Sequence, residues 1–373
     1  MVKIGVLFST TGPYAAMGRD CWDGAAFAVA ELAAEGAAVE PVFVDAHGDP
    51  ARYLDGARAL IRDAGCRQIV GTITSLARKE VIPLVEKHDG LLWYTCPYEG
   101  FEANENVVYT GACPNQHLVP LFDYLIPRHG DRPYLVGANY VWGWEMNRLA
   151  RELIMEAGGE VLGERYLPFE ETAVERLVAD VAARRPSFIL NNLIGPASYA
   201  FLRAVRDLGR RDAAFSPERC PVVSCDLTEC ELEAVGPGVA AGQLAVASYF
   251  DSLASPENLD LKRRVAAHFG PGRRVSAFFA GAYTAIRMCA EAVAAAGSDE
   301  PEAVRRALAG PPRDSVFGPL RIDPRTSHAA LPFHLGRITA DGGFDIVASR
   351  PAIAADPYLV GRHGGRPRLR LVR

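Results

Sequence analysis

The chain has 373 residues, of which 49% are hydrophobic and 23% charged, as in ordinary soluble proteins. At about 100–200 residues per domain, this length predicts two or three globular units with sizeable cores. The formal charge is -5 at pH 7, whereas general polyanion binders are basic, so nucleic acid is not expected as a partner. No apolar run approaches the ~20 residues that cross a bilayer, so no membrane span is expected.

The first part of the chain alternates short apolar runs with helical patterns. The expected elements are strands at 2–8, 39–44, 68–71 and 91–94, and helices at 22–32, 50–61 and 75–88. Strands separated by helices of this length predict βαβ units and a parallel sheet, hence an α/β fold.

A second series repeats this architecture. Its expected elements are strands at 134–137, 160–167, 188–193 and 221–224, and helices at 144–157, 173–183 and 198–208. From about residue 245 the pattern changes to helices at 258–269 and 276–296, a strand at 315–322 and two strands within 333–347. Asp341-Gly342-Gly343 is a plausible hairpin turn between the last two.

The N-terminus and the cysteines bear on the cellular compartment. The apolar part of residues 1–8 is shorter than a secretory signal and has the pattern of a buried first strand. The eight cysteines contain no C-x-x-C pair and no common zinc spacing, which favours reduced structural thiols and no metal site. We therefore expect a cytoplasmic protein. The alternative is a periplasmic or extracytoplasmic protein whose signal sequence is missing from this chain.

Enzyme motifs are absent from the sequence. It has no glycine-rich phosphate loop, no H-E-x-x-H and no G-x-S-x-G, and we expect neither a catalytic site nor a cofactor. An amidase or other hydrolase would need an activated nucleophile beside a base, and Cys96 has no histidine near it in the sequence.

Polar residues at the expected strand ends are candidates for ligand binding. Thr74 and Ser75 follow one strand and open a helix, where free backbone N–H groups suit a carbonyl or carboxylate oxygen. Both are also ordinary N-cap residues. Tyr94 and Thr95 end the next strand, and ligands of open parallel sheets lie beyond such ends. In the second series Asp226 would neutralise an ammonium or accept from an amide, unless Asp226 or Thr228 only caps the following helix.

Aromatic side chains gather at two of these strand ends. They include three of the four tryptophans, and the set is Trp93, Tyr94, Tyr98, Tyr140, Trp142 and Trp144. Together they suggest the lining of a small, partly apolar pocket with hydroxyl and indole donors.

Several strings, densest between residues 70 and 145, carry a resemblance to a known family. They include Gly48-Asp49-Pro50, Ser75 with Arg78-Lys79, Pro97-Tyr98-Glu99-Gly100-Phe101-Glu102, Pro114-Asn115-Gln116 and Asn139-Tyr140. The chain resembles the type I periplasmic-binding-protein family. Its likeness is strongest to the branch that binds urea and short-chain amides and to the amide-sensing negative regulators of aliphatic amidase operons.

The resemblance implies two lobes, each a mainly parallel sheet flanked by helices, with a ligand cleft between them. With the pattern changes near residues 118, 247 and 325, it divides the chain into lobe I (1–118 plus 247–325), lobe II (119–246 plus 326–355) and a basic tail (356–373). The tail holds Arg362, Arg366, Arg368, Arg370 and Arg373. It would be solvated, or would contact an acidic partner surface.

The resemblance also implies roles for individual residues. Ser75 would hold the polar head of the ligand, and Tyr94, Cys96 and Tyr140 would line the same pocket. Three positions depart from the amide regulators: Ile73 replaces an aromatic residue, Cys96 a threonine and Trp142 a tyrosine. The pocket therefore has fewer hydroxyls and a different volume, which can change the ligand.

Two functions follow as competing hypotheses. The main one is a cytoplasmic sensor that closes its lobes on a small neutral polar ligand, an amide or urea, and alters its hold on a regulatory protein partner similar to an antiterminator. The alternative is the substrate-binding component of an ABC importer for amides, urea or branched-chain amino acids, with a permease as partner. Either protein would form a homodimer or act alone.

Overall fold

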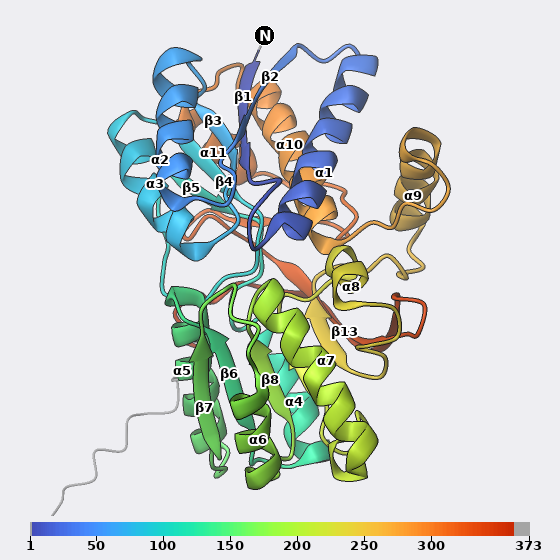
Figure 1. The fold of residues 1–373 in the computed structure, drawn as a ribbon. Helices are drawn as coiled ribbons and strands as arrows, with labels where there is room; N and C mark the ends of the chain where they lie inside the picture. Colours follow the sequence, from blue (N-terminus) through green and yellow to red (C-terminus); the bar gives the residue numbers. More distant parts are fainter. Residues whose placement is uncertain (1, 362–373) are drawn as a thin grey trace, which may run out of the picture.

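The structure is a computed structural model that describes residues 2–361. The chain forms two lobes, drawn one above the other in Figure 1, and each is built on a seven-stranded sheet flanked by helices. The strand orders are β11-β12-β5-β4-β3-β1-β2 in the first lobe and β14-β13-β10-β9-β8-β6-β7 in the second. The predicted fold class is confirmed.

The first lobe takes elements from both ends of the chain. Its strands are β1 (Val2–Phe8), β2 (Val39–Asp45), β3 (Gln68–Gly71), β4 (Leu91–Tyr94), β5 (Val107–Tyr109), β11 (Ile322–Asp323) and β12 (His328–Ala329). Its helices are α1 (Ala15–Ala34), α2 (Pro50–Arg58) with the π-helical turn Ala59–Asp63, α3 (Ser75–Lys87), α9 (Pro256–Phe269), α10 (Ala277–Ala296) and α11 (Pro301–Leu308).

The second lobe is mostly continuous in sequence. Its strands are β6 (Tyr134–Ala138), β7 (Gly163–Leu167), β8 (Ile189–Asn192), β9 (Val222–Ser224), β10 (Leu244–Ala247), β13 (Leu331–Ile338) and β14 (Phe344–Ile353). Its helices are α4 (Leu118–His129), α5 (Val141–Glu156), α6 (Glu175–Arg184), α7 (Pro196–Arg211), the 3₁₀ turn Ala213–Phe215 and α8 (Glu229–Val235).

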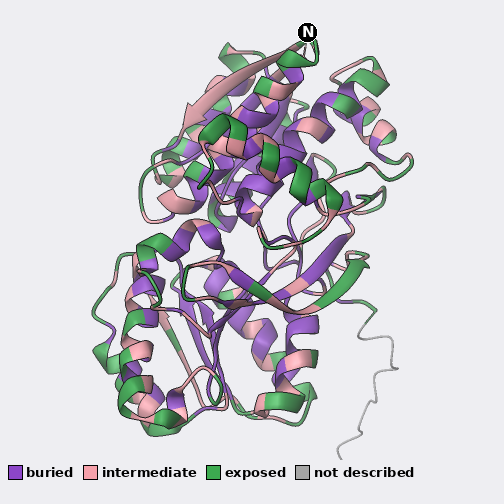
Figure 2. Ribbon diagram, turned by 90° about the vertical axis from the view of Figure 1, so that its right-hand side faces the viewer, coloured by how far each residue is buried: buried purple, intermediate pink, exposed green. Residues whose placement is uncertain are grey.

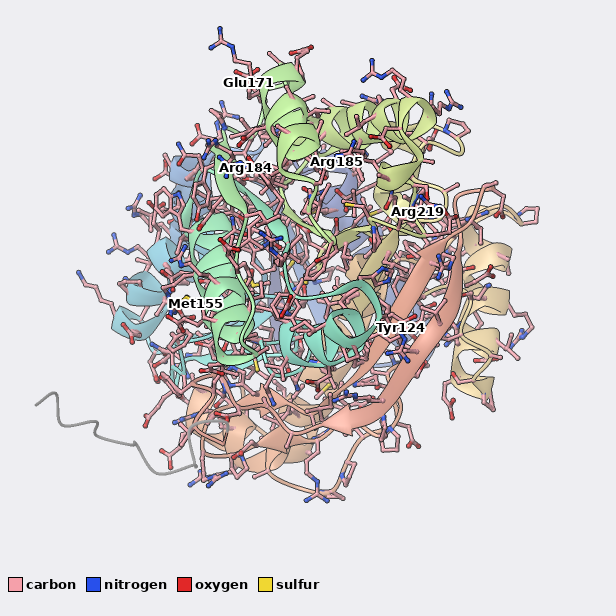
Figure 3. All side chains as sticks on the ribbon, turned by 90° about the horizontal axis from the view of Figure 1, so that it is seen from below. Tyr124, Met155, Glu171, Arg184, Arg185 and Arg219 are labelled. Atoms are coloured by element: carbon pink, nitrogen blue, oxygen red, sulfur yellow. The ribbon has the colours of Figure 1, made fainter. Side chains whose placement is uncertain are left out.

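Burial explains why the central strands form near-continuous apolar runs. Every residue of β3, β4, β6 and β8 is buried, because helices cover both faces of a parallel sheet. The edge strand β7 is half-exposed instead. Buried residues accordingly concentrate in the strands and on the inner sides of the helices in Figure 2. The far end of the second lobe, seen from below in Figure 3, is polar, with Arg184, Arg185 and Arg219 exposed and Glu171 half-buried.

The chain passes between the two sheets three times. The crossovers are residues 110–117 after β5, residues 248–255 after β10, and Ala330 between β12 and β13. The sequence predicts that the third crossover between the lobes lies at residue 325. In the structure, β12 still pairs with β5 of the first lobe through His328 and Tyr109.

After β14 the chain returns to the first lobe. The side-chain amide of Asn115 donates to the carbonyl oxygen of Ala354 at 2.8 Å, and the backbone N–H of Asp356 donates to Asn115 Oδ1 at 2.9 Å. The five arginines of the predicted tail lie outside the described residues.

One strand prediction is wrong. Residues 315–322 form a turn, in which Gly318 has φ +85° and its N–H donates to the carbonyl oxygen of Ser315 at 2.9 Å. Only the bridge between Arg313 and Leu320 and the two residues of β11 are extended there. Glycine accommodates a positive φ without steric cost, and the apolar alternation around it does not reveal the turn.

Candidate ligand-binding site

A cavity lies between the lobes, beyond the carboxyl ends of strands from both sheets. We call it the cleft cavity; about 30 Å³ of it is open to the centre of a water molecule. Its lining residues are Tyr14, Met17, Ile73, Thr74, Ser75, Tyr94, Cys96, Pro97, Tyr140, Trp142, Ile194, Asp226 and Phe278. Eight of the nine residues singled out from the sequence are among them.

The ninth, Thr95, lies elsewhere. Its neighbours Tyr94 and Cys96 line the cleft cavity, while Thr95 lines a second cavity beside it. Successive side chains of an extended segment point to opposite sides, so the residue between two cavity-lining residues is directed away.

The start of α3 forms one wall of the cleft cavity. Thr74 is the N-cap residue, and its hydroxyl accepts from the backbone N–H of Ala77 at 3.2 Å, so capping engages this side chain. Ser75 is buried, and its hydroxyl donates to the carboxylate of Glu99. The helix N-terminus also places the positive end of its dipole at this wall.

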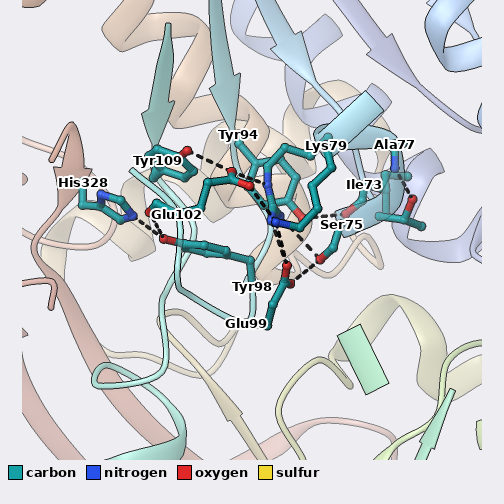
Figure 4. Close-up of polar contacts among 12 residues, drawn as sticks. Ile73, Ser75, Ala77, Lys79, Tyr94, Tyr98, Glu99, Glu102, Tyr109 and His328 are labelled. Atoms are coloured by element: carbon teal, nitrogen blue, oxygen red, sulfur yellow. Dashed lines mark hydrogen bonds and ion pairs between the residues drawn. The ribbon is translucent and has the colours of Figure 1, made fainter. Parts of the chain in front are cut away.

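A buried ionic cluster supports this wall (Figure 4). The Arg78 guanidinium is fully buried and pairs with Glu99 Oε1 at 2.9 Å and with Glu102 Oε1 at 2.8 Å. Lys79 Nζ lies 2.9 Å from Glu102 Oε2. Burial alone would raise the pKa of Glu102, but Arg78 and Lys79 hold it below its ordinary value. Two cations thus balance two carboxylates.

The same cluster fixes the aromatic side chains beside it. The Arg78 guanidinium lies 4.5 Å from the ring centroid of Tyr94 and 4.7 Å from that of Tyr98. The Tyr94 hydroxyl donates to the carbonyl oxygen of Ile73 at 2.8 Å. The Tyr98 hydroxyl is hydrogen-bonded to His328. This wall is therefore rigid and electrostatically complete before any ligand arrives.

The second lobe contributes two aromatic residues from the start of α5. Tyr140 is the N-cap residue, and its ring centroid lies 4.7 Å from that of Phe169. Trp142 is 3% exposed, and its indole Nε1–H has no hydrogen-bond acceptor within residues 2–361. A buried donor without a partner costs about 1–3 kcal/mol, so the Trp142 indole is suited to an incoming acceptor.

Asp226 forms the other polar feature of the second lobe. It follows β9, is 7% exposed, and forms no ion pair with any residue that the structure describes. Burial raises the pKa of its carboxyl group to about 8. Thr228 is the N-cap residue of α8, yet its hydroxyl contacts Cys230 Sγ at 3.4 Å and makes no capping bond. The capping alternative therefore does not account for Asp226.

The prediction that six aromatic residues line one pocket is wrong for three of them. Trp93 lies in the core of the first lobe and donates to Gln68 Oε1 at 2.9 Å. Trp144 is 48% exposed and donates to Asn139 Oδ1 at 3.1 Å. Tyr98 belongs to the Arg78 cluster. Only Tyr94, Tyr140 and Trp142 reach the cleft cavity.

Five lining residues were not singled out from the sequence. Tyr14 ends the polar loop after β1, and Ile194 and Pro97 follow β8 and β4, so the strand-end rule applied to every strand would have found them. Phe278 and Met17 lie on α10 and α1, where helical periodicity does not distinguish a cavity wall from the core.

Cys96 lacks the neighbours of a catalytic nucleophile. Its thiol contacts the carbonyl oxygen of Thr72 at 3.6 Å and Thr95 Oγ1 at 4.0 Å. No histidine is among the residues that line the cleft cavity. The described residues that line the cavity therefore do not form a cysteine–histidine pair with Cys96.

The two lobes, the crossovers and the cleft cavity define a ligand-binding protein of the periplasmic-binding type. The family model described as periplasmic binding protein domain matches residues 2–363, and the chain belongs to this family. The family model and the relatives that match over most of this chain are binding proteins.

Individual relatives agree with this assignment. The chain is 25% identical over 366 residues to Leu/Ile/Val-binding protein homolog 6 of Brucella abortus (strain 2308), covering 92% of this chain and 89% of the relative. A solute-binding protein of an ABC transporter from Rhodopseudomonas palustris HaA2, in complex with p-hydroxybenzoic acid, has a TM-score of 0.85 at 21% identity and covers 97% of this chain and 99% of that one. An amino acid ABC transporter substrate-binding protein from Pseudomonas fluorescens Pf-5 has a TM-score of 0.80 at 20% identity, covering 94% and 96%. Among residues 2–361, no helix is both long and apolar enough to cross a membrane.

Proposed function

We propose that this protein is the substrate-binding component of an ABC importer, located outside the cytoplasmic membrane, and that its ligand is a small amino acid. The observation that carries the ligand class is Asp226. A buried carboxyl group without a cationic partner lies in the second lobe, on the wall of the same cavity as the N-terminus of α3.

This arrangement matches the two charges of a zwitterion. The ligand ammonium would pair with Asp226, and the ligand carboxylate would lie at the start of α3, where the first backbone N–H groups of the helix and the Trp142 indole are available as donors. A buried charge is costly unless it is paired, so an ammonium would compensate the carboxylate that burial disfavours.

The division of the site between lobes supports a role in capture and delivery. Ser75 belongs to the first lobe, whereas Trp142 and Asp226 belong to the second. A ligand that contacts both walls binds the closed form better than the open form and shifts the population toward closure. A permease that recognises the closed form would be the partner.

A short-chain amide or urea is a second candidate ligand. With a pKa of about 8, the Asp226 carboxyl group is mostly protonated at pH 7 and would donate a hydrogen bond to a neutral carbonyl. The resemblance to the amide-binding branch gives this candidate independent support.

Thermal denaturation of the purified chain with a ligand panel tests the proposal. Alanine, leucine, acetamide, butyramide and urea would each be compared in the wild type, in Asp226→Asn and in the exposed control Asp63→Asn. An amino acid at 100 times its dissociation constant should raise the free energy of unfolding of the wild type and the control by ~2.7 kcal/mol. The same ligand concentration should not stabilise Asp226→Asn. A panel without any shift in the wild type would overturn the proposal.

A further inference from the structure

A second cavity adjoins the cleft cavity at the crossovers between the lobes. We call it the hinge cavity; about 40 Å³ of it is open to the centre of a water molecule. All three crossover regions contribute to its lining, through Thr110–Ala112 with Gln116 and His117, through Val246–Ser248, and through Leu331. A single water needs about 10–15 Å³ by this measure, so the hinge cavity has room for several non-hydrogen atoms.

His117 lines the hinge cavity and carries an unused acceptor. The side chain is 2% exposed, and its Nε2 lies 3.1 Å from the carbonyl oxygen of Tyr98. A carbonyl only accepts, so Nε2 carries the proton and Nδ1 holds a lone pair. Burial lowers the pKa of His117 to about 4, which keeps this tautomer neutral at pH 7. Nδ1 has no donor among residues 2–361.

Two further polar side chains of this lining are already engaged, whereas Asp226, which also lines the cleft cavity, forms no ion pair within residues 2–361. The Thr110 hydroxyl donates to the carbonyl oxygen of Tyr94 at 3.2 Å. The Gln116 amide donates to the carbonyl oxygens of Ala329 and Ile353, both at 2.8 Å. Much of the remaining lining is apolar, including Ala112, Val246, Phe317 and Leu331. An apolar body with one hydrogen-bond donor therefore matches this cavity.

The two cavities are adjacent. Pro97, Asp226 and Phe278 line both of them. The ring centroids of His117 and Trp142 lie 6.3 Å apart, and both rings carry a buried polar atom without a partner. Trp142, which carries an unused donor, thus lines the cleft cavity, His117, which carries an unused acceptor, lines the hinge cavity, and Asp226 lines both.

We propose that the two cavities form one two-armed binding site. The polar head of the ligand occupies the cleft cavity, and its side chain enters the hinge cavity, where a terminal hydroxyl or N–H donates to His117 Nδ1. This inference rests on the proposed function and narrows the substrate class to small amides or amino acids whose chain ends in a hydrogen-bond donor. Ordered water at His117 is the competing occupant.

Isosteric ligand pairs distinguish the two occupants. Homoserine and norvaline differ by a terminal hydroxyl in place of a methyl group, as do 3-hydroxypropionamide and butyramide. Calorimetric titration would measure each pair, together with alanine and acetamide as ligands too short to reach His117. In the wild type we expect the hydroxylated member of the binding pair to bind about tenfold more tightly, since it satisfies a buried acceptor that the methyl analogue leaves unpaired.

Two variants and one control complete the experiment. His117→Met should abolish the hydroxyl preference, and Ala247→Leu, which fills the hinge cavity, should weaken both long ligands at least tenfold. Both variants should lose much less affinity for alanine or acetamide than for the long ligands, because the short ligands do not enter the hinge cavity. His129→Met, at the opposite end of α4 from His117, should retain the preference.

The possible failures are distinct. If short ligands bind but the wild type shows no preference for the hydroxylated ligand, or if His117→Met retains the preference, His117 is solvated by water and the inference is wrong. If neither short nor long ligands bind the wild type, the proposed function fails, and this extension fails with it.

Discussion

The two walls of the cleft differ in how completely their charges are paired. In the first lobe, Arg78 and Lys79 balance Glu99 and Glu102, and Ser75 is hydrogen-bonded to Glu99. In the second lobe, Asp226 has no cationic partner and the Trp142 indole has no acceptor within the described residues. The charged groups of the first-lobe wall are already paired, whereas the second-lobe wall carries polar groups without partners that a ligand can satisfy. Closure of the second lobe over a ligand held at the first therefore has a source of free energy in these groups.

The largest change in the free energy of unfolding is expected from a substitution that unpairs the buried charges of the first lobe. Arg78→Met leaves the buried carboxylates Glu99 and Glu102 without their shared cation, and it should lower the free energy of unfolding by roughly 3–5 kcal/mol. Urea denaturation measures this change. The control is Arg132→Met, because the exposed pair of Arg132 with Glu160 is worth at most about 1 kcal/mol. If both variants lost the same free energy of unfolding, the buried cluster would contribute no more than the surface pair, and the prediction would be wrong.

In the second lobe we expect the opposite change, a substitution that raises the free energy of unfolding. The pKa of Asp226 is about 8 in the folded chain and ~3.9 when unfolded, so the folded state binds more protons between these values and loses stability as pH rises through this window. Asp226→Asn removes that loss. It should stabilise the ligand-free protein by roughly 2–4 kcal/mol at pH 8 and by little near pH 4. Urea denaturation at both pH values tests this, and a destabilised Asp226→Asn at pH 8 would show that the carboxylate has a partner in the free protein.

A smaller change, in ligand affinity, is expected to distinguish two neighbouring tryptophans of α5. Trp142→Phe removes the unused indole donor of the cleft cavity and should weaken ligand binding about five- to tenfold, as expected for one hydrogen bond. Trp144→Phe is the matched control, because Trp144 is half-exposed outside the cavity. Calorimetric titration measures both. Unchanged affinity in Trp142→Phe would remove the indole from the proposed site.

The sequence predicts which residues line the cleft cavity better than it predicts which of them lack a partner. Thr74, Tyr94 and Asp226 all follow strands, and parallel strands present their carboxyl ends at one edge, so local patterns suffice to bring them together. The placement of Trp93 and Trp144 depends on which side of a strand or helix faces the core, and that is decided by packing between distant segments. Phe278 reaches the cavity because the crossover at residues 248–255 returns the chain to the first lobe before α9 and α10. The lack of a partner for Asp226 is a property of its folded surroundings, which no local pattern contains.

Short and irregular elements show the same limit. The short strands β5 and β10 were missed, although other strands of three or four residues were predicted. The turn at Gly318 was taken for a strand because its flanking residues are apolar. In contrast, the long βαβ segments on both sides of residue 118 were predicted in order, since their periodicity extends over many residues.

The pH dependence of ligand affinity tests the central claim, that Asp226 is completed by the ligand. Calorimetric titration of alanine or leucine between pH 6 and pH 9 should show affinity rising by up to about tenfold per pH unit until pH 8 and then levelling, because an ammonium pairs only with the ionised carboxylate. The dependence should vanish in Asp226→Asn. Affinity that is constant to pH 8 and falls above it, seen with acetamide or butyramide, would contradict the ammonium pairing and assign the site to a neutral amide.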